Sequence, residues 1–191
     1  MIAEQHLQVN TEEKEIRALL RQAGSFEKGF ELMVRTYQQR LYAHIRRILP
    51  DHHQSDDVLQ NTFLKAWKAY PDFRGDSQLY TWLYRIATNE ALSLLRSEKR
   101  RLIHTGKESD TEQIAGSLNA GDAGGDEITH RLHDAIRKLP PKQQAIFNMK
   151  YFDEMTYEDM ATVTGTSVGA LKASYHHAVK KIEKAVLRER P

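Results

Sequence analysis

Apolar residues recur along the chain at steps of three and four, in several separate segments. The longest such stripe begins at Phe26 and ends before Pro50. Its members are Phe26, Phe30, Met33, Tyr37, Leu41, Ile45 and Ile48. Steps of three and four place side chains on one face of an α-helix, whereas the alternation typical of a half-buried strand is almost absent. The pattern therefore predicts an all-α protein.

Two further helices are predicted after this one. We expect Ser55 to cap the first of them, with Asp56 and Asp57 in its first turn, because short polar side chains and acids suit a helix N-terminus. Pro71 ends it, and Ser77 is expected to cap the next helix. The first helix directs these residues to the core: Leu59, Thr62, Phe63, Ala66, Trp67 and Tyr70. The second directs these inward: Leu79, Trp82, Leu83, Ile86, Ala87, Ala91, Leu94 and Leu95.

Composition changes after Arg101. Residues 102–125 are rich in Gly, Ser and Asn, are acidic, and show little apolar periodicity, which is typical of a flexible linker. An acidic linker also makes the flanking segments more basic than the net charge of +2 suggests. We therefore expect two small helical domains, at 25–101 and 127–191, joined by a linker at 102–126. The lead-in at 1–24 carries a short predicted helix, at 11–22, with no readable role.

Bulk composition excludes several kinds of chemistry. The 191 residues contain no cysteine, so a disulfide framework, a thiolate metal site and a cysteine nucleophile are absent. No apolar run is long enough to span a bilayer or to form the core of a signal peptide. We expect a cytoplasmic protein that is not inserted in a membrane.

The segment from Thr156 to Lys184 has the pattern of a helix-turn-helix. Thr156 and Asp159 form a capping-box-like start, Gly165 suits a tight turn, and Ser167 is placed to cap a longer helix. One side of that helix is apolar: Val168, Leu171, Tyr175, Ala178 and Ile182. The other side is polar or basic: Lys172, Ala173, His176, His177, Lys180 and Lys184. Such a helix fits the major groove of duplex DNA.

Aromatic and basic residues are mixed in the loop after Pro71 and in the first turns of the helix that follows it. They are Phe73, Arg74, Tyr80, Trp82, Tyr84 and Arg85. Aromatic rings stack on unpaired bases and arginines pair with phosphates, so this mixture favours single-strand binding. We expect Trp82 to be mainly packing, and Phe73 and Tyr80 to be more open to contact.

Three sets of segments, in order along the chain, resemble bacterial RNA polymerase sigma factors of the extracytoplasmic-function (ECF) type. Asp56 to Trp67 is similar to the polymerase-binding helix of the family. Phe73 to Ser77, followed by Thr81 to Asn89, is similar to its DNA-melting segment. The matches to its region 4 are Leu139–Gln144, Tyr157–Ala161 and Ser167–Lys172. The resemblance covers residues 26–101 (region 2) and 127–188 (region 4).

The resemblance implies a transcription initiation factor that is not an enzyme and needs no cofactor. It implies binding to core RNA polymerase and to promoter DNA with −35 and −10 elements. The second domain would contact the β flap, and the acidic linker would run towards the RNA exit channel. The residues implied to dock on the clamp helices of the β′ subunit are Asp57, Gln60, Asn61 and Leu64. Many members are held inactive by an anti-sigma factor, which is a further partner to expect.

The resemblance also implies two sets of DNA contacts. The set for the −10 strand is Phe73, Arg74, Ser77, Tyr80, Arg85, Asn89, Arg96, Lys99 and Arg100. The set for the −35 duplex is Ser167, Lys172, Ala173, His176, His177 and Lys180. Where many relatives carry arginines on the −35 helix, this chain has Lys172, Ser174 and His177. Lysine does not reproduce the bidentate fork of arginine, so the base preference is left open.

Three other functions would each explain part of the sequence. A helix-turn-helix regulator that binds duplex DNA alone would explain Thr156 to Lys184, but not the Asp57–Trp67 helix followed by an aromatic and basic loop. Nine histidines suggest a metal-dependent enzyme as an alternative. However, His52–His53 and His176–His177 are adjacent pairs whose side chains diverge on a helix. Residues 165–169 spell the G-x-S-x-G pattern of hydrolases, which requires a preceding strand that the sequence lacks.

Overall fold

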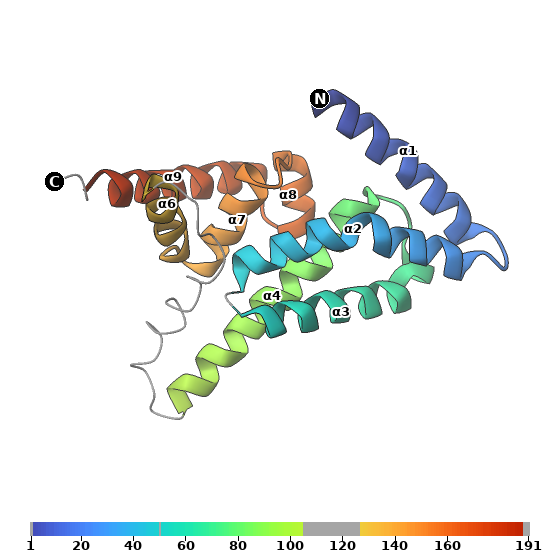
Figure 1. The fold of residues 1–191 in the computed structure, drawn as a ribbon, viewed down its shortest axis with the longest axis horizontal. Helices are drawn as coiled ribbons and strands as arrows, with labels where there is room; N and C mark the ends of the chain where they lie inside the picture. Colours follow the sequence, from blue (N-terminus) through green and yellow to red (C-terminus); the bar gives the residue numbers. More distant parts are fainter. Residues whose placement is uncertain (1, 50, 105–126, 189–191) are drawn as a thin grey trace.

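Every regular element that the computed structural model describes, in residues 2–49, 51–104 and 127–188, is a helix (Figure 1). In chain order these are α1 (Ile2–Arg21), α2 (Phe26–Ile48), α3 (His52–Ala69), the 3-10 turn η1 (Tyr70–Asp72), α4 (Leu79–His104), α6 (Glu127–Arg137), α7 (Pro141–Tyr151), α8 (Tyr157–Thr164) and α9 (Val168–Arg188). The all-α prediction is confirmed. Of the predicted linker at 102–126, residues 102–104 continue α4, and the remainder lies outside the described residues.

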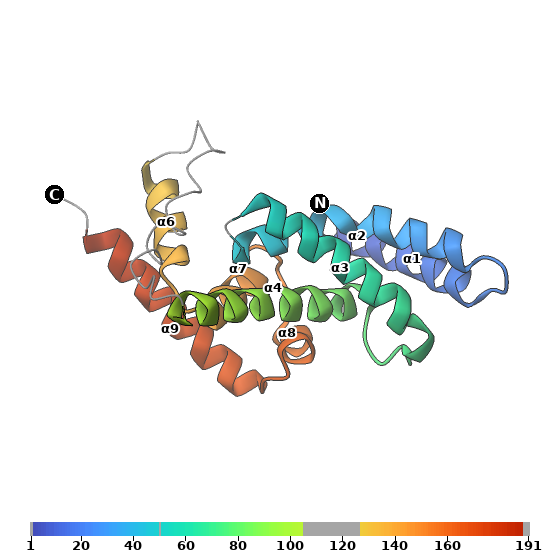
Figure 2. The same cartoon turned by 90° about the horizontal axis from the view of Figure 1, so that it is seen from below.

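The first half of the chain is a bundle of four helices, with α2 in its centre. The predicted stripe of α2 is buried from Phe30 to Ile48, while Phe26 is half-buried. After α1 the chain turns at Gly24, and α2 returns alongside α1 (Figure 2). A methyl group added at Gly29 of α2 would lie 2.7 Å from the main-chain nitrogen of Leu20, so the two helices approach too closely for any other residue.

The predicted cap at Ser55 is wrong, because α3 begins about one turn earlier. The carboxylate of Asp51 accepts a hydrogen bond from the amide of Gln54 (2.8 Å), which makes Asp51 the N-cap. Ser55 is buried inside the helix and its hydroxyl donates to the Asp51 carbonyl (2.7 Å). Asp56 and Asp57 consequently lie in the second turn.

The predicted cap at Ser77 is also wrong. Helix α4 begins at Leu79, and the amide of Leu79 donates to the carboxylate of Glu13 in α1 (2.9 Å). The cap of this helix therefore comes from a residue 66 positions away in the chain. Ser77 instead presents its carbonyl to the side chain of Arg17 (2.6 Å).

The second half contains the predicted helix-turn-helix, α8 and α9. The hydroxyl of Thr156 accepts from the amide of Asp159 (3.1 Å), and Gly165 ends α8 with a φ of 65°. Leu171, Ala178 and Ile182 of α9 are buried, as the apolar stripe predicted. Helices α6, α7 and α9 enclose a small hydrophobic cluster of their own.

The two halves pack against each other, with α8 against α4 and α7 against α2 (Figures 1 and 2). The larger hydrophobic cluster extends through both halves: it contains Met33 and Leu41 of α2 together with Met149, Met160 and Leu171 from the second half. The candidate DNA-reading parts of the two halves are therefore joined in one packed structure.

Candidate nucleic-acid interface and docking face

The docking face proposed on α3 is exposed. Its four predicted residues, Asp57, Gln60, Asn61 and Leu64, are all at the surface, and 52% of Leu64 is exposed. The prediction that Trp67 belongs to the core is only partly right. Its ring packs edge-on against Phe26 and Phe30 (4.8 Å between centroids in each case), yet 41% of the residue is exposed.

Leu64 and Trp67 are three positions apart on a helix, so they share one face and present two large apolar side chains there. Aromatic and aliphatic residues surrounded by polar ones are typical of a protein–protein interface. Sequence periodicity misplaced Trp67 because a residue at the edge of an apolar stripe is half covered.

The loop from Phe73 to Ser77, here called the −10 loop, is less open than predicted. Phe73 is half-buried: its ring lies 4.8 Å from that of Trp82 and 5.4 Å from the guanidinium carbon of Arg17. Tyr80 is half-buried as well, and its hydroxyl donates to the carboxylate of Asp159 (2.8 Å). Both are more exposed than Trp82, as predicted, but α1 covers part of Phe73 and α8 covers part of Tyr80. Trp82 is buried, as predicted.

The remaining residues predicted to contact the −10 strand lie along the loop and α4. Ser77 is half-buried, and the others are exposed: Arg74, Arg85, Asn89, Arg96, Lys99 and Arg100. The five of these that belong to α4 extend from its second turn towards its C-terminal part. Five of the six exposed side chains are cationic, which suits a path for a phosphate backbone.

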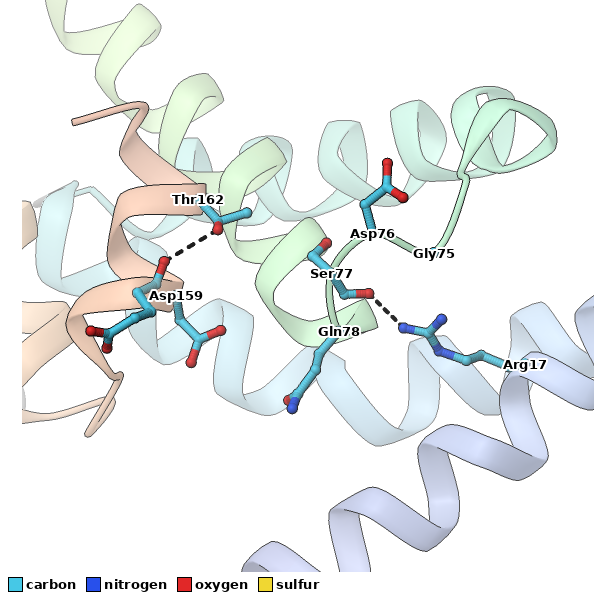
Figure 3. Close-up of a pocket in the computed structure, with 8 residues that line it drawn as sticks. Arg17, Gly75, Asp76, Ser77, Gln78, Asp159 and Thr162 are labelled. Carbon is cyan, nitrogen blue, oxygen red and sulfur yellow. Dashed lines mark hydrogen bonds between the residues drawn. The ribbon is translucent and has the colours of Figure 1, made fainter. Parts of the chain in front are cut away.

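A cleft of about 390 Å³ lies beside the −10 loop (Figure 3). Arg17 and residues 75–78 line one part of it, and Glu158, Asp159 and Thr162 of α8 line another. Gly75 has a φ of 82°, and a methyl group added there would lie 3.2 Å from the guanidinium of Arg17. Glycine is therefore favoured here by the backbone conformation, and any side chain at this position would also have to displace the guanidinium of Arg17.

The carboxylate of Asp159 connects the cleft to the second half of the chain. It accepts hydrogen bonds from the hydroxyls of Tyr80 (2.8 Å) and Thr81 (3.0 Å). Burial is the larger cause, and the hydrogen bond to Asp159 the second, that raises the pKa of Tyr80 far above its ordinary value. The phenol therefore remains a hydrogen-bond donor throughout the physiological pH range.

A second polar contact between the halves is centred on Asp153, which is 6% exposed at its side chain. Its carboxylate oxygens lie 2.7 Å from Nδ1 of His44 and 2.8 Å from the guanidinium of Arg47. His44 is fully buried, and its Nε2 lies 2.9 Å from the hydroxyl of Thr88. Asn148 adds a hydrogen bond from its Nδ2 to the carbonyl of Arg47 (3.1 Å).

Neither contact was predicted from the sequence. Asp159 was recognised only as part of the α8 cap, and Asp153 follows α7 in a short turn with no motif. His44 offered the better signal, since it is a polar residue beside the apolar stripe of α2. A buried histidine requires hydrogen-bond partners, and these come from the other half and from α4.

The predicted −35 face on α9 is open. All six of its predicted residues are exposed: Ser167, Lys172, Ala173, His176, His177 and Lys180. The Ser167 hydroxyl accepts from the amide of Ala170 (3.4 Å), which supports its role as a cap. The ammonium of Lys172 lies 5.6 Å from the ring of Tyr157, so α8 orients a side chain of the basic face.

Two features are absent from the described parts of the chain. Among the described side chains, no group of three acidic or histidine residues could hold a metal ion. No helix within the described ranges is long and apolar enough to cross a membrane.

Two family descriptions match the sequence. "Sigma-70 region 2" matches residues 33–101, and "Sigma-70, region 4" matches residues 129–182. Among curated relatives, the RNA polymerase sigma-H factor of Pseudomonas aeruginosa is 33% identical over 184 residues, which are 92% of this chain and 95% of that protein. The ECF RNA polymerase sigma-E factor of Escherichia coli K12 is 30% identical over 172 residues, 84% of this chain and 87% of that protein.

Solved structures show the same fold at lower sequence identity. The sigma factor RpoE in complex with the anti-sigma factor NepR, from Bartonella quintana, has a TM-score of 0.67 at 22% identity, covering 85% of this chain and 99% of that chain. CnrH in complex with the cytosolic domain of CnrY has a TM-score of 0.63 at 21% identity, covering 86% of this chain and 91% of that chain.

Proposed function

The chain belongs to the ECF type of the sigma-70 family, and we propose that three separate surfaces bind core polymerase, the −10 element and the −35 element. A member of this family binds core RNA polymerase and promoter DNA and is not an enzyme. The assignment of residues to each surface is our proposal, as are the division into domains at 25–101 and 127–191 and a cytoplasmic location.

The first surface is the docking face on α3. We assign Asp57, Gln60, Asn61 and Leu64 to contact with the clamp helices of the β′ subunit. The support is their common exposure on one helix, together with the half-exposed Trp67 beside Leu64. A few apolar anchors among polar groups are the usual source of affinity at such interfaces. An anti-sigma factor would act by covering this face.

The second surface reads the −10 element. The −10 loop and the start of α4 would hold a base flipped out of the non-template strand, and Asn89 would contact a base edge. Arg96, Lys99 and Arg100 would neutralise phosphates. The cleft beside Gly75 supports this assignment because unstacking a base costs a few kcal/mol, which stacking and a fitted pocket offset.

The third surface is the −35 face on α9, and it carries the proposal most directly. Its six predicted residues are exposed together on the second helix of a helix-turn-helix, the element that enters the major groove. Lys172 and the two histidines are the candidates for base and phosphate contacts. The second domain would also bind the β flap while this face contacts DNA.

Run-off transcription with core polymerase tests the proposal. Genomic DNA fragments would be transcribed with and without this protein, and we expect new transcripts that share an upstream −35 and −10 pair. Specific binding of the protein alone to duplex DNA, without any new transcript, would instead favour a regulator that acts without polymerase.

Two variants then separate the surfaces. Lys172→Ala should weaken −35 binding by roughly 1 to 3 kcal/mol, the usual cost of one DNA contact, and leave the affinity for core polymerase unchanged. Asp57→Ala combined with Gln60→Ala should do the reverse without loss of helicity. Each variant is the control for the other, and an equal loss of both affinities in either one contradicts the division.

A further inference from the structure

Helix α1 lies outside the region 2 match, which begins at residue 33, yet two of its polar side chains reach the −10 loop. We propose that Glu13 and Arg17 of α1 are positioning residues for −10 recognition: they hold the −10 loop and the first turn of α4 in the shape that captures an unpaired base. This inference rests on the proposed role of the loop.

Glu13 supplies the fixed point of this arrangement. The residue is 7% exposed, and its Oε1 accepts hydrogen bonds from the Arg17 Nε (2.9 Å) and from the amide of Leu79 (2.9 Å). The Leu79 amide is one of the donors that a helix leaves unpaired at its N-terminus, where a carboxylate is electrostatically favourable. Glu13 thus caps α4 from outside and determines where that helix begins.

Arg17 extends the contact to both ends of the loop. Its guanidinium donates to the carbonyl of Ser77 (2.6 Å) and lies over the ring of Phe73 (5.4 Å from the guanidinium carbon to the ring centroid). Its ion pair with Glu13 (2.7 Å) fixes the plane of the guanidinium. A planar group with several donors can serve these three partners together, whereas the point charge of a lysine cannot.

Glu13 and Arg17 are not the only attachment of α1 to the bundle, although the hydroxyl of Tyr37 in α2 also donates to Glu13 (3.4 Å). Ile16 and Leu20 are buried at 0% and 5% exposure, and Gly29 allows the close approach of α1 to α2. Apolar burial therefore holds α1 against α2 independently of these two polar side chains. A buried carboxylate costs free energy unless it is paired. Glu13 and Arg17 find three of their partners, Leu79, Ser77 and Phe73, in the −10 loop and α4.

The test uses holoenzyme made with full-length Glu13→Gln, Arg17→Ala or Arg17→Lys, and promoter DNA identified by run-off transcription. Three affinities are measured: for a fluorescent single strand with the non-template −10 sequence, for the −35 duplex, and for core polymerase. Lys14→Ala and Glu15→Gln are matched controls, because both residues are exposed on the same helix.

We expect Glu13→Gln and Arg17→Ala to lower the single-strand affinity about tenfold, or ~1.4 kcal/mol. We also expect them to reduce the difference in affinity between the −10 sequence and other sequences. The −35 and polymerase affinities should stay at the values of the controls. Arg17→Lys should behave as Arg17→Ala does, since it keeps the charge but not the shape.

Three results would overturn the inference. A wild-type single-strand affinity in all variants would mean that the loop needs no support from α1. A parallel loss of all three affinities would reduce the pair to a folding role. Full activity of Arg17→Lys would mean that Arg17 acts as a positive charge near DNA. If wild-type holoenzyme itself ignored the −10 strand, the proposed function of the loop would fail first.

Discussion

The two surfaces proposed to read DNA differ in what covers them. All six predicted −35 residues, at the start of α9 and along it, are exposed. At the start of α4, by contrast, the hydroxyls of Tyr80 and Thr81 donate hydrogen bonds to Asp159 of α8. A hydroxyl has a single proton to donate, so while these two groups donate to Asp159 they cannot also donate to a DNA strand. The predicted −35 face is therefore exposed in this structure, and we expect the start of α4 to become fully accessible to DNA only when α8 shifts away from it.

The same difference holds for the residues beneath these surfaces. The interface between the halves contains a polar network around Asp153 with a fully buried histidine, in addition to apolar contacts. The contacts behind α9 are mostly apolar, within the cluster of α6, α7 and α9. Polar networks depend on geometry and lose much of their value when one partner is removed, so the contact between the halves is the part that we expect a single substitution to loosen.

The largest effect is expected from Asp153→Ala. It leaves His44 and Arg47 without their common acceptor, and a lost hydrogen bond to a charged group costs about 1.5 to 3 kcal/mol. We expect urea unfolding to shift to lower concentration and to separate into two transitions, one for each half. Asp56→Ala is the control, since it removes an exposed carboxylate from α3. A single transition at the wild-type midpoint would show that apolar contacts alone hold the halves together.

A smaller effect is expected from Asp159→Ala, which frees Tyr80 and Thr81. Two hydrogen bonds from neutral donors to a carboxylate are lost between the halves, each worth about 1.5 kcal/mol, the lower end of the range for a charged partner, so part of the population should open. The chain has no cysteine, so Arg35→Cys and Lys184→Cys provide unique sites for a donor and an acceptor dye. We expect a lower transfer efficiency between the dyes and tighter binding of the −10 strand by holoenzyme.

The control for this measurement is Glu158→Ala, which removes an exposed carboxylate from the same turn of α8. It should leave the dye distance unchanged. If both variants open the structure equally, charge on α8 matters and the specific contact to Tyr80 does not.

The smallest effect concerns alkaline pH. Burial raises the pKa of Tyr80 and of Tyr84 in the folded chain, so both stay protonated above pH ~10, where tyrosines of the unfolded chain ionise. Their contribution to stability is complete below pH ~10 and is lost as the pH rises further towards the folded pKa values. Tyr80→Phe should therefore flatten the alkaline decline in the free energy of unfolding. An unchanged slope, equal to that of the 53% exposed control Tyr151→Phe, would contradict this.

Several features were predictable because they depend on neighbours within one or two helical turns. The stripe of α2, the exposed side of α3, the turn at Gly165 and the basic face of α9 all follow from spacing at three and four. The caps at Ser55 and Ser77 were mispredicted for the same reason. A serine before an apolar run is a good local signal, but the Asp51 carboxylate caps α3 at an earlier residue, and the Glu13 carboxylate accepts from the first amide of α4.

The sequence by itself determined most of the helices, the helix-turn-helix and the segments that match the family, because each is encoded by residues close together in the chain; the first helix was predicted at 11–22, whereas α1 begins at Ile2. Only the tertiary structure decided that Glu13 caps α4 and that Asp159 covers the −10 surface. These contacts join residues 66 and 79 positions apart. A single carboxylate in either segment has no pattern that identifies its distant partner, and the partner is chosen by the packing of α1 and α8 on the bundle.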